Sequence, residues 1–142
     1  MSAEIITLWQ ESREQAFSRC RETIRAGGTV AYPTDTFYAL GVDPRNLRAV
    51  QRLFEVKGRS EDQPILLLIS DVSAVGEWAA EVSATARRLM EQFWPGPLTL
   101  VFAARPNVLP QLTGGTGQIG LRVPGSELTR SLLSFTGDSL TG

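Results

Sequence analysis

The feature of this sequence that most constrains its fold is a short apolar run, ILLLI at residues 65–69. Pro64 precedes the run, and Ser70-Asp71 follows it. A strand with one face in water alternates apolar and polar residues, whereas an unbroken run of this length is typical of a strand covered on both faces. The run is far too short to span a bilayer. It therefore predicts a sheet that lies between two layers of a globular protein.

Helical and strand-like segments alternate along the rest of the chain. Ser12 and Gln15 form a capping-box pattern, and Asn46, Ser83 and Ser126 can cap further helices. Two strand-like segments follow one another after residue 97, which predicts a mixed sheet. We therefore expect an α/β domain with strands at 5–9, 29–32, 37–42, 65–69, 98–103 and 118–123, and with helices between Ser12 and Gly27, between Asn46 and Gly58, at 72–80, at 84–93 and after Ser126.

The charge balance argues against several classes of partner. The formal net charge is -1, which disfavours a nucleic-acid-binding arm or a membrane-surface patch, although a local basic cluster is compatible with it. The N-terminus, MSAEIITLW, has neither the basic region nor the apolar core of a signal peptide. We therefore expect a cytoplasmic enzyme or binding module with no membrane partner.

Two features of the composition limit the chemistry open to this chain. The sequence has no histidine, which excludes Ser-His-Asp and Cys-His catalysis, histidine metal ligands and a histidine general base. Cys20 is the single cysteine, so the chain forms no internal disulfide and no thiolate zinc site. Its helical spacing from Ala16 and Ile24 predicts a core position. Chemistry must therefore rest on hydroxyls, carboxylates, Arg, Lys and backbone amides.

Lys57 is the one lysine among 14 basic residues. A general bias toward arginine explains the others, but the planar guanidinium fork cannot replace a compact ammonium where reach and shape matter. Lys57 lies in EVKGRSEDQP, between a predicted helix end and the apolar run, where a cation could bind a phosphate or a carboxylate. The alternative is that Lys57 and Arg59 only complement the dipole and carbonyls of a helix C-terminus.

Two further segments carry polar groups in unexpected places. PTDT at 33–36 ends a predicted strand. It is either a turn whose side chains bind local backbone amides or one wall of a site. Arg122 lies among apolar residues in the strand IGLRVP, where a cation needs an anionic partner. WPGPLT at 94–99 is a rigid corner, to which we assign a scaffold role.

Residues 115–120 match the dinucleotide-binding pattern G-x-G-x-x-G, which raises the alternative of an NAD-dependent oxidoreductase. That pattern requires a strand before it and a helix after it. Here the preceding segment, ARPNVLPQLT, is loop-like, and the following LRVPG is strand-like. The context therefore disfavours a dinucleotide site, while a flexible loop whose amides approach a ligand is still compatible with it.

Five segments, taken in order, resemble the YrdC/YciO family of threonylcarbamoyl-AMP synthases: GGTVAYPTDTFYALG, FEVKGR, QPILLLI, FWPGPLTLVF and IGLRVP. The resemblance extends from about Ile5 to Gly142, essentially the whole chain. It implies a twisted, open mixed sheet with flanking helices and a concave, electropositive cavity. It also implies a nucleotidyltransferase that condenses L-threonine, bicarbonate and ATP into threonylcarbamoyl-AMP and pyrophosphate. The product would serve tRNA threonylcarbamoyladenosine modification, completed by downstream tRNA-modification proteins.

The resemblance also implies roles for individual residues. Thr34 matches a contact to the substrate threonine, with Thr36 beside it, and Arg122 matches the arginine that holds the substrate carboxylate. No side chain needs to act as a nucleophile or carry a proton, because adenylation of a carboxylate depends on positioning and charge neutralisation. We therefore expect binding residues and no catalytic residue in the strict sense.

The nucleotide is implied to meet a different set of residues. Lys57 and Arg59 match a K-x-R pair that contacts the phosphates of ATP, and Gln118 falls where the family often has a nucleotide-contacting threonine. Mg²⁺ is implied together with ATP as substrate. The sequence does not indicate its ligands.

Three positions depart from the family pattern. Ala39 stands where many members have glycine, and Leu68 stands where some have histidine. The chain ends in SLLSFTGDSLTG, before the Ser-x-Asn motif that in the family contacts substrate and ATP. We therefore expect residues 1–142 to form a single YrdC-like domain without its C-terminal part, soluble but poorly active.

A non-catalytic member of the same family is the alternative function. It would bind nucleotide, tRNA or double-stranded RNA through the cavity, and RNA binding would be sensitive to salt. The basic residues within 45–59 are the local feature that supports it, and a solvated helix face explains them equally well.

Overall fold

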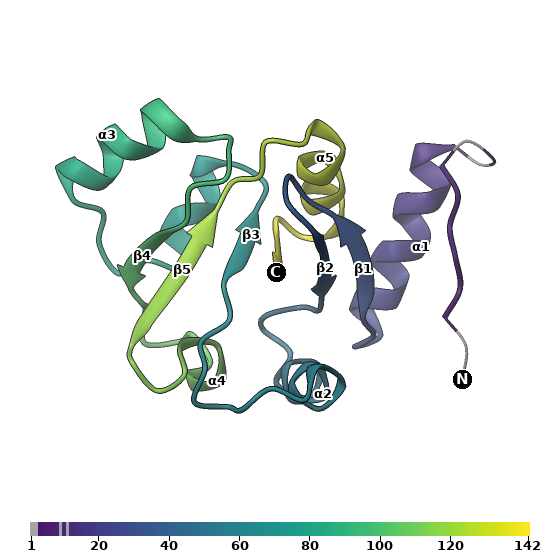
Figure 1. The fold of residues 1–142 in the computed structure, drawn as a ribbon, viewed down its shortest axis with the longest axis horizontal. Coiled ribbons are helices and arrows are strands. Elements are labelled where there is room, and N and C mark those ends of the chain that lie inside the picture. The colour runs from purple at the N-terminus through teal and green to yellow at the C-terminus, as the bar shows by residue number, and fades with distance from the viewer. Residues whose placement is uncertain (1–2, 9, 11) are drawn as a thin grey trace.

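A computed structural model describes residues 3–8, 10 and 12–142. Its centre is a four-stranded sheet in the order β4-β5-β3-β6 (Figure 1). Strand β3 (Leu67–Ile69) runs parallel to β5 (Gln118–Arg122), whereas β4 (Leu100–Ala103) and β6 (Ser139–Thr141) are antiparallel to their neighbours. The expected mixed sheet is therefore confirmed.

An antiparallel hairpin, β1 (Val30–Pro33) with β2 (Tyr38–Gly41), lies beside the free edge of β6. Thr141 joins the two sheets, because its Oγ1 accepts a hydrogen bond from the Val42 N–H at 3.0 Å and its N–H donates to the Val42 carbonyl at 3.3 Å. The buried Tyr32 hydroxyl donates to the Thr141 carbonyl at 2.7 Å. These bonds fix the base of the hairpin, while its turn extends away from α2, as Figure 1 shows.

Four longer helices flank the two sheets: α1 (Arg13–Arg25), α2 (Leu47–Lys57), α3 (Ala84–Phe93) and α5 (Glu127–Thr136). Each begins where a capping residue was expected, and the side chains of Ser12, Asn46, Ser83 and Ser126 all accept a backbone N–H of the first turn. Such a cap contributes typically about 1 kcal/mol to helix stability. Among the described residues, no helix combines the length and the apolar character needed to cross a bilayer.

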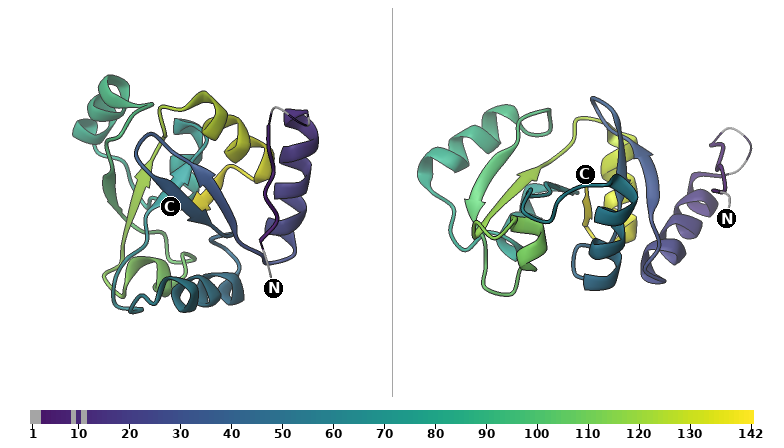
Figure 2. Two further views of the ribbon diagram at one scale, coloured as in Figure 1. Left: turned by 45° about the vertical axis from the view of Figure 1, so that its right-hand side comes forward. Right: turned by 60° about the horizontal axis from the view of Figure 1, so that its bottom comes forward.

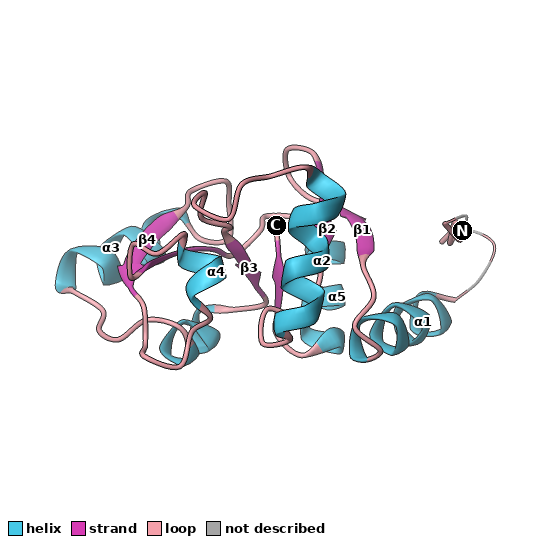
Figure 3. Ribbon diagram, turned by 90° about the horizontal axis from the view of Figure 1, so that it is seen from below, coloured by secondary structure: helices cyan, strands magenta, loops and turns pink. Residues whose placement is uncertain are grey.

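The core lies on both faces of β3. Leu67 and Ile69 belong to a large cluster with α2, and Leu68 belongs to a smaller cluster with Tyr32 and Leu133. All three β3 residues are buried, which confirms the strand covered on both sides. Figure 2 shows α1 and α5 against the hairpin, and in Figure 3, viewed from below, α2 and α4 (Pro110–Thr113) lie at the near end of the molecule.

Several local expectations differ from the structure. Residues 5–8 form no strand, and Ile5 is exposed, so the strand expected at 5–9 is wrong over these residues, while Trp9 lies outside the described residues. The helix expected at 72–80 is a 3₁₀ helix over Val72–Glu77. Helix α4 and strand β6 were not expected. Helix α4 is a single turn of four residues, and β6 has three residues, so both give weak sequence signals. Helix α4 also begins at a proline, which suits the first position of a helix but is a common loop residue as well.

Candidate functional site

The PTDT segment forms the turn of the β1–β2 hairpin. The Thr34 N–H and the Thr34 hydroxyl both donate to the Phe37 carbonyl, at 3.2 and 2.5 Å. The Thr34 hydroxyl also accepts the Thr36 N–H at 3.3 Å and lies 3.3 Å from the Thr36 hydroxyl. Thr34 is half-buried and Thr36 is exposed. The turn interpretation is confirmed for Thr34, which closes the turn, whereas the interpretation as one wall of a site stays a prediction.

Asp35 does not bind the local amides that the turn interpretation assigned to it. Its carboxylate accepts the N–H groups of Gly125 and Ser126, at 2.7 and 3.0 Å, at the beginning of helix α5. The buried Thr129 hydroxyl donates to the Pro33 carbonyl at 2.7 Å. The hairpin turn is therefore attached to the segment that directly follows strand β5 and its last residue, Arg122.

Arg122 is half-buried, and its partner is a hydroxyl. Its Nε and Nη2 atoms donate to Thr99 Oγ1, at 3.0 and 2.9 Å. No carboxylate of the described chain is the anionic partner expected for Arg122, so a substrate carboxylate in that role stays a prediction. The scaffold role of WPGPLT is consistent with this arrangement, since the Trp94 indole donates to the Leu98 carbonyl beside Thr99 at 2.7 Å.

Lys57 and Arg59 lie at the C-terminal end of α2, on either side of Gly58, which has a φ of 60°. The Arg59 Nη2 atom donates to the Pro64 carbonyl at 2.7 Å, just before β3. Burial lowers the pKa of Lys57 from its ordinary value, and the positive charge of Arg59 lowers it further. Two adjacent cations that destabilise one another electrostatically favour a bound anion.

Gln118 is exposed at the start of β5, and its N–H donates to the Thr116 hydroxyl at 3.1 Å. The glycine loop before it ends in Gly115 and Gly117, both with positive φ, and leads into strand β5 instead of a helix. The strand-like character of the segment after the glycine loop is confirmed. The helix that would have to meet a pyrophosphate is therefore missing at this place, as the sequence context predicted.

The six residues fall into two groups by the elements that carry them. The turn group comprises Thr34 and Thr36 of the hairpin turn, together with Arg122, the last residue of β5, and Asp35 connects the two through Gly125. The α2 group comprises Lys57 and Arg59 at the C-terminal end of α2, together with Gln118 at the start of β5. Along β5, Gln118 and Arg122 lie roughly 13 Å apart. Arg59 lines a pocket of about 570 Å³ together with Phe54 and Glu61.

In the part of the chain that the structure describes, the cations of both groups lack carboxylate partners. Within the described residues, Lys57, Arg59 and Arg122 have no Asp or Glu oxygen within 4.0 Å, and the Arg59 Nε atom is buried without a hydrogen-bond acceptor. Among the described residues, four other arginines pair with carboxylates, as Arg45 does with Glu77 at 2.8 Å, whereas others, such as Arg105 and Arg130, donate to carbonyl oxygens. Half-buried cations without a carboxylate partner are what a site for anionic ligands requires.

The basic residues proposed for RNA binding are partly occupied by other contacts. Arg45, besides its ion pair with Glu77, stacks on Trp78 with 4.3 Å between the guanidinium carbon and the ring centroid. Arg52 pairs with Glu55 at 3.8 Å. These contacts reduce the free positive charge of the 45–59 segment and weaken the case for RNA binding there.

No metal site is formed by the protein alone in the part of the chain that the structure describes, since three acidic or thiol side chains nowhere gather closely enough to hold an ion. Mg²⁺ in nucleotide sites is held largely by phosphate oxygens and water, with one or two carboxylates.

Reasoning from the sequence missed two contributors to this surface. Thr99, which orients Arg122, was assigned only to a scaffold, and the long-range role of Asp35 carries no local sequence signal. The departures at Ala39 and Leu68 prove mild: Ala39 has no positive φ, and Leu68 is buried in the smaller core cluster.

The chain is similar to a family described as "Telomere recombination", whose Sua5, YciO and YrdC model matches residues 22–142. The threonylcarbamoyl-AMP synthase of Thiobacillus denitrificans is 40% identical over 126 residues, which cover 86% of this chain and 67% of the relative. The synthase of Bacillus subtilis is 36% identical over 115 residues, covering 80% of this chain and 33% of the relative. The chain thus spans about a third to two thirds of these curated relatives.

Solved structures give the same result. Sua5 of Pyrococcus abyssi complexed with L-threonine has a TM-score of 0.85 and 33% identity, covering 97% of this chain and 39% of the neighbour. YciO of E. coli has a TM-score of 0.81 and 27% identity, covering 90% of this chain and 62% of the neighbour. The family match over most of the chain, together with this fold, shows that the chain belongs to the Sua5/YciO/YrdC family.

Proposed function

We propose that this chain forms threonylcarbamoyl-AMP and pyrophosphate from L-threonine, bicarbonate and ATP. The observation that carries the proposal is that Arg122 at the end of β5, and Lys57 and Arg59 at the C-terminal end of α2, are half-buried cations without carboxylate partners in the described chain. L-Threonine offers a carboxylate to the first, and ATP offers phosphates to the other two. The names of the curated relatives and the L-threonine complex of P. abyssi Sua5 support it.

The turn group would bind the amino acid. The guanidinium of Arg122, held from one side by Thr99, would donate two parallel hydrogen bonds to the threonine carboxylate. Thr34 and Thr36 would present hydroxyls to the polar groups of the amino acid. Since Thr34 donates within the turn, its free capacity is mainly that of an acceptor, which suits the substrate amine or hydroxyl.

The α2 group would bind ATP. Lys57 would serve as a point charge and Arg59 as a fork on the phosphates, with Gln118 contacting the nucleotide. Mg²⁺, bound to the phosphate oxygens, would neutralise part of their charge. The described residues would position and neutralise the triphosphate, and no step here requires a histidine.

The reaction balances without an enzyme nucleophile. A bond forms between the threonine amine nitrogen and the bicarbonate carbon with loss of water, and a carbamate oxygen then bonds to the α-phosphorus while the bond to the β-phosphate breaks. Pyrophosphate leaves with the electron pair. What the protein must supply is alignment of the three reactants and neutralisation of the departing charge, which this surface offers.

The experiment that tests this function measures pyrophosphate release by the 142-residue chain with ATP, L-threonine and bicarbonate, and with each omitted in turn. We expect release that requires all three, together with calorimetric binding of L-threonine and of ATP. The proposal is refuted if the chain releases no pyrophosphate or binds no L-threonine. The cytoplasm and the tRNA-modification proteins that would take up the product belong to the same proposal.

Non-catalytic binding of tRNA or double-stranded RNA is the weaker candidate, because Arg45 and Arg52 are engaged by carboxylates. It would require RNA binding that weakens with salt and with Lys57→Ala. RNA binding unchanged in that variant would argue against the candidate site as the RNA surface.

A further inference from the structure

The carboxylate of Asp35 binds the backbone of a segment about 90 residues away. Its Oδ2 accepts the Gly125 N–H at 2.7 Å and its Oδ1 accepts the Ser126 N–H at 3.0 Å. Ser126 is itself the N-cap of the ten-residue helix α5, and its side chain accepts the Thr129 N–H at 3.3 Å. Asp35 therefore accepts the N–H groups of the two residues just before α5, whereas the Ser126 side chain caps an N–H inside the first turn. The charge of Asp35 lies where the helix dipole favours an anion.

Gly125 is needed at this contact for reasons of space. A Cβ atom on Gly125 would lie 2.8 Å from Asp35 Oδ2, closer than such atoms approach one another. The backbone there is not in the left-handed region, so the constraint is the approach of the carboxylate and not the conformation of the glycine. Gly125 and Asp35 form a matched pair, one small enough for the other to reach the amide.

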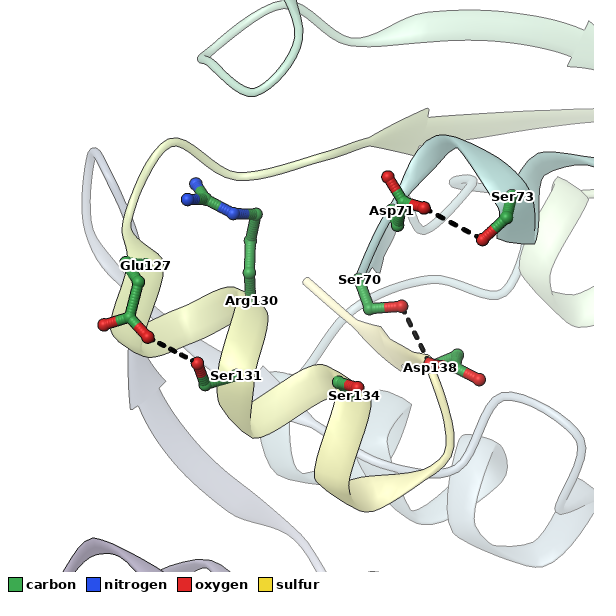
Figure 4. Close-up of a pocket in the computed structure, with 8 residues that line it drawn as sticks. All are labelled: Ser70, Asp71, Ser73, Glu127, Arg130, Ser131, Ser134 and Asp138. Atoms are coloured by element: carbon green, nitrogen blue, oxygen red, sulfur yellow. Dashed lines mark hydrogen bonds between the residues drawn. The ribbon is translucent and has the colours of Figure 1, made fainter.

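Two side chains of α5 hold the same junction from the other side. The Arg130 Nη1 atom donates to the carbonyls of Pro124 and Gly125, at 2.9 and 2.7 Å, and Figure 4 shows Arg130 rising from α5 beside the loop that leads into that helix. The buried Thr129 hydroxyl donates to the Pro33 carbonyl at 2.7 Å. The N–H groups of the loop between β5 and α5 are thus bonded to the hairpin, its C=O groups are bonded to α5, and α5 is itself bonded to the hairpin through Thr129.

We propose that Asp35 is a positioning residue that holds the hairpin turn, with Thr34, against the end of β5, with Arg122. Asp35 follows Thr34 directly, and Gly125 lies three residues after Arg122, so the two hydrogen bonds of Asp35 connect the halves of the turn group. The inference rests on the proposed function only in assigning L-threonine to that group. The connection itself exists in the free protein.

The test compares two variants that break this connection from opposite sides. Asp35→Asn keeps the size of the side chain and removes the charge and one accepting oxygen, and Gly125→Ala displaces the carboxylate. We expect both to raise the Kd for L-threonine about fivefold or more, because hydrogen bonds to a charged group are lost, and to leave the Kd for ATP within about twofold. Asp35→Glu, which restores the charge, should recover part of the affinity.

The control is Ser83→Ala, which removes the cap of α3, a helix that carries none of the six site residues. It should lower stability to a similar degree while both Kd values stay unchanged. If Asp35→Asn weakens the binding of L-threonine and ATP equally, or neither, the positioning role is refuted.

A second readout does not depend on any ligand. In ¹⁵N-labelled protein, Asp35→Asn should shift the amide resonances of Gly125, Ser126 and Thr34 and the Nε–H resonance of Arg122. If the wild type binds no L-threonine, the proposed function fails, and these shifts still decide the connection. Shifts confined to Gly125 and Ser126, with Thr34 and Arg122 unmoved, would overturn it.

Discussion

Replacing Thr99 with valine tests whether the orientation of Arg122 matters for substrate binding. The Thr99 hydroxyl accepts both Nε and Nη2 of Arg122, at 3.0 and 2.9 Å, and valine preserves the branched shape of the side chain without the acceptor. The guanidinium would keep its charge and lose the group that fixes its direction. The variant therefore separates the orientation of the cation from its presence.

The size of the effect follows from the geometry. Ordering a long side chain at a binding site costs about 0.5–1.5 kcal/mol, and Arg122 would have to be ordered anew by the ligand. We therefore expect the Kd for L-threonine to rise about two- to tenfold. Because both donors share one oxygen and Arg122 is half-buried, water replaces part of the lost bonding, and the free energy of unfolding should fall by only about 1 kcal/mol.

Calorimetry with L-threonine and with ATP provides the assay. The Kd for ATP should not change, since the proposed ATP ligands Lys57 and Arg59 lie at the C-terminal end of α2. Thr85→Val is the matched control, because it makes the same chemical change at an exposed position of α3. The reasoning is refuted if the Nε–H resonance of Arg122 moves in Thr99→Val while the affinity for L-threonine stays the same.

Three other predictions concern single side chains. ATP should raise the depressed pKa of Lys57, and ATP affinity should fall as the pH rises through that pKa, because only the protonated amine attracts phosphate. Since Lys57 is the one lysine, ¹³C-labelled lysine gives a single resonance whose pH titration can be followed with and without ATP. A titration that ATP does not change would contradict this prediction. Thr34→Val should raise the Kd for L-threonine with ATP binding intact, whereas lost stability alone would leave only the turn role. Tyr32→Phe should lower the free energy of unfolding by about 1–3 kcal/mol in urea titrations, because the buried Thr141 carbonyl loses its donor, and an unchanged midpoint would speak against this anchor of β6.

The sequence signals that succeeded are local ones. The caps Ser12, Asn46 and Ser83 act within one helical turn, and Gly58 ends α2 because it adopts a positive φ. The apolar run around Leu67 predicted its own burial on both sides. Such features depend on neighbours within a few residues, which is why they can be identified in a linear sequence.

The features that could not be predicted depend on distant partners. Strand β6 is defined by its pairing with β3 and by the bonds of Thr141 to the hairpin, about 100 residues earlier. Asp35 has the composition of an ordinary turn residue, and its two acceptor bonds exist only because the chain brings Gly125 beside it. Arg122 was recognised as unusual, but its hydroxyl partner Thr99 was indistinguishable from other strand residues.

The central claim is that the turn group binds L-threonine and the α2 group binds ATP. It is tested most directly by calorimetry of Arg122→Gln and Lys57→Gln, each titrated with L-threonine and with ATP. The account predicts that Arg122→Gln weakens only L-threonine binding and that Lys57→Gln weakens only ATP binding. If both variants weaken the same ligand, or if each weakens the ligand assigned to the other, the division of the site is contradicted.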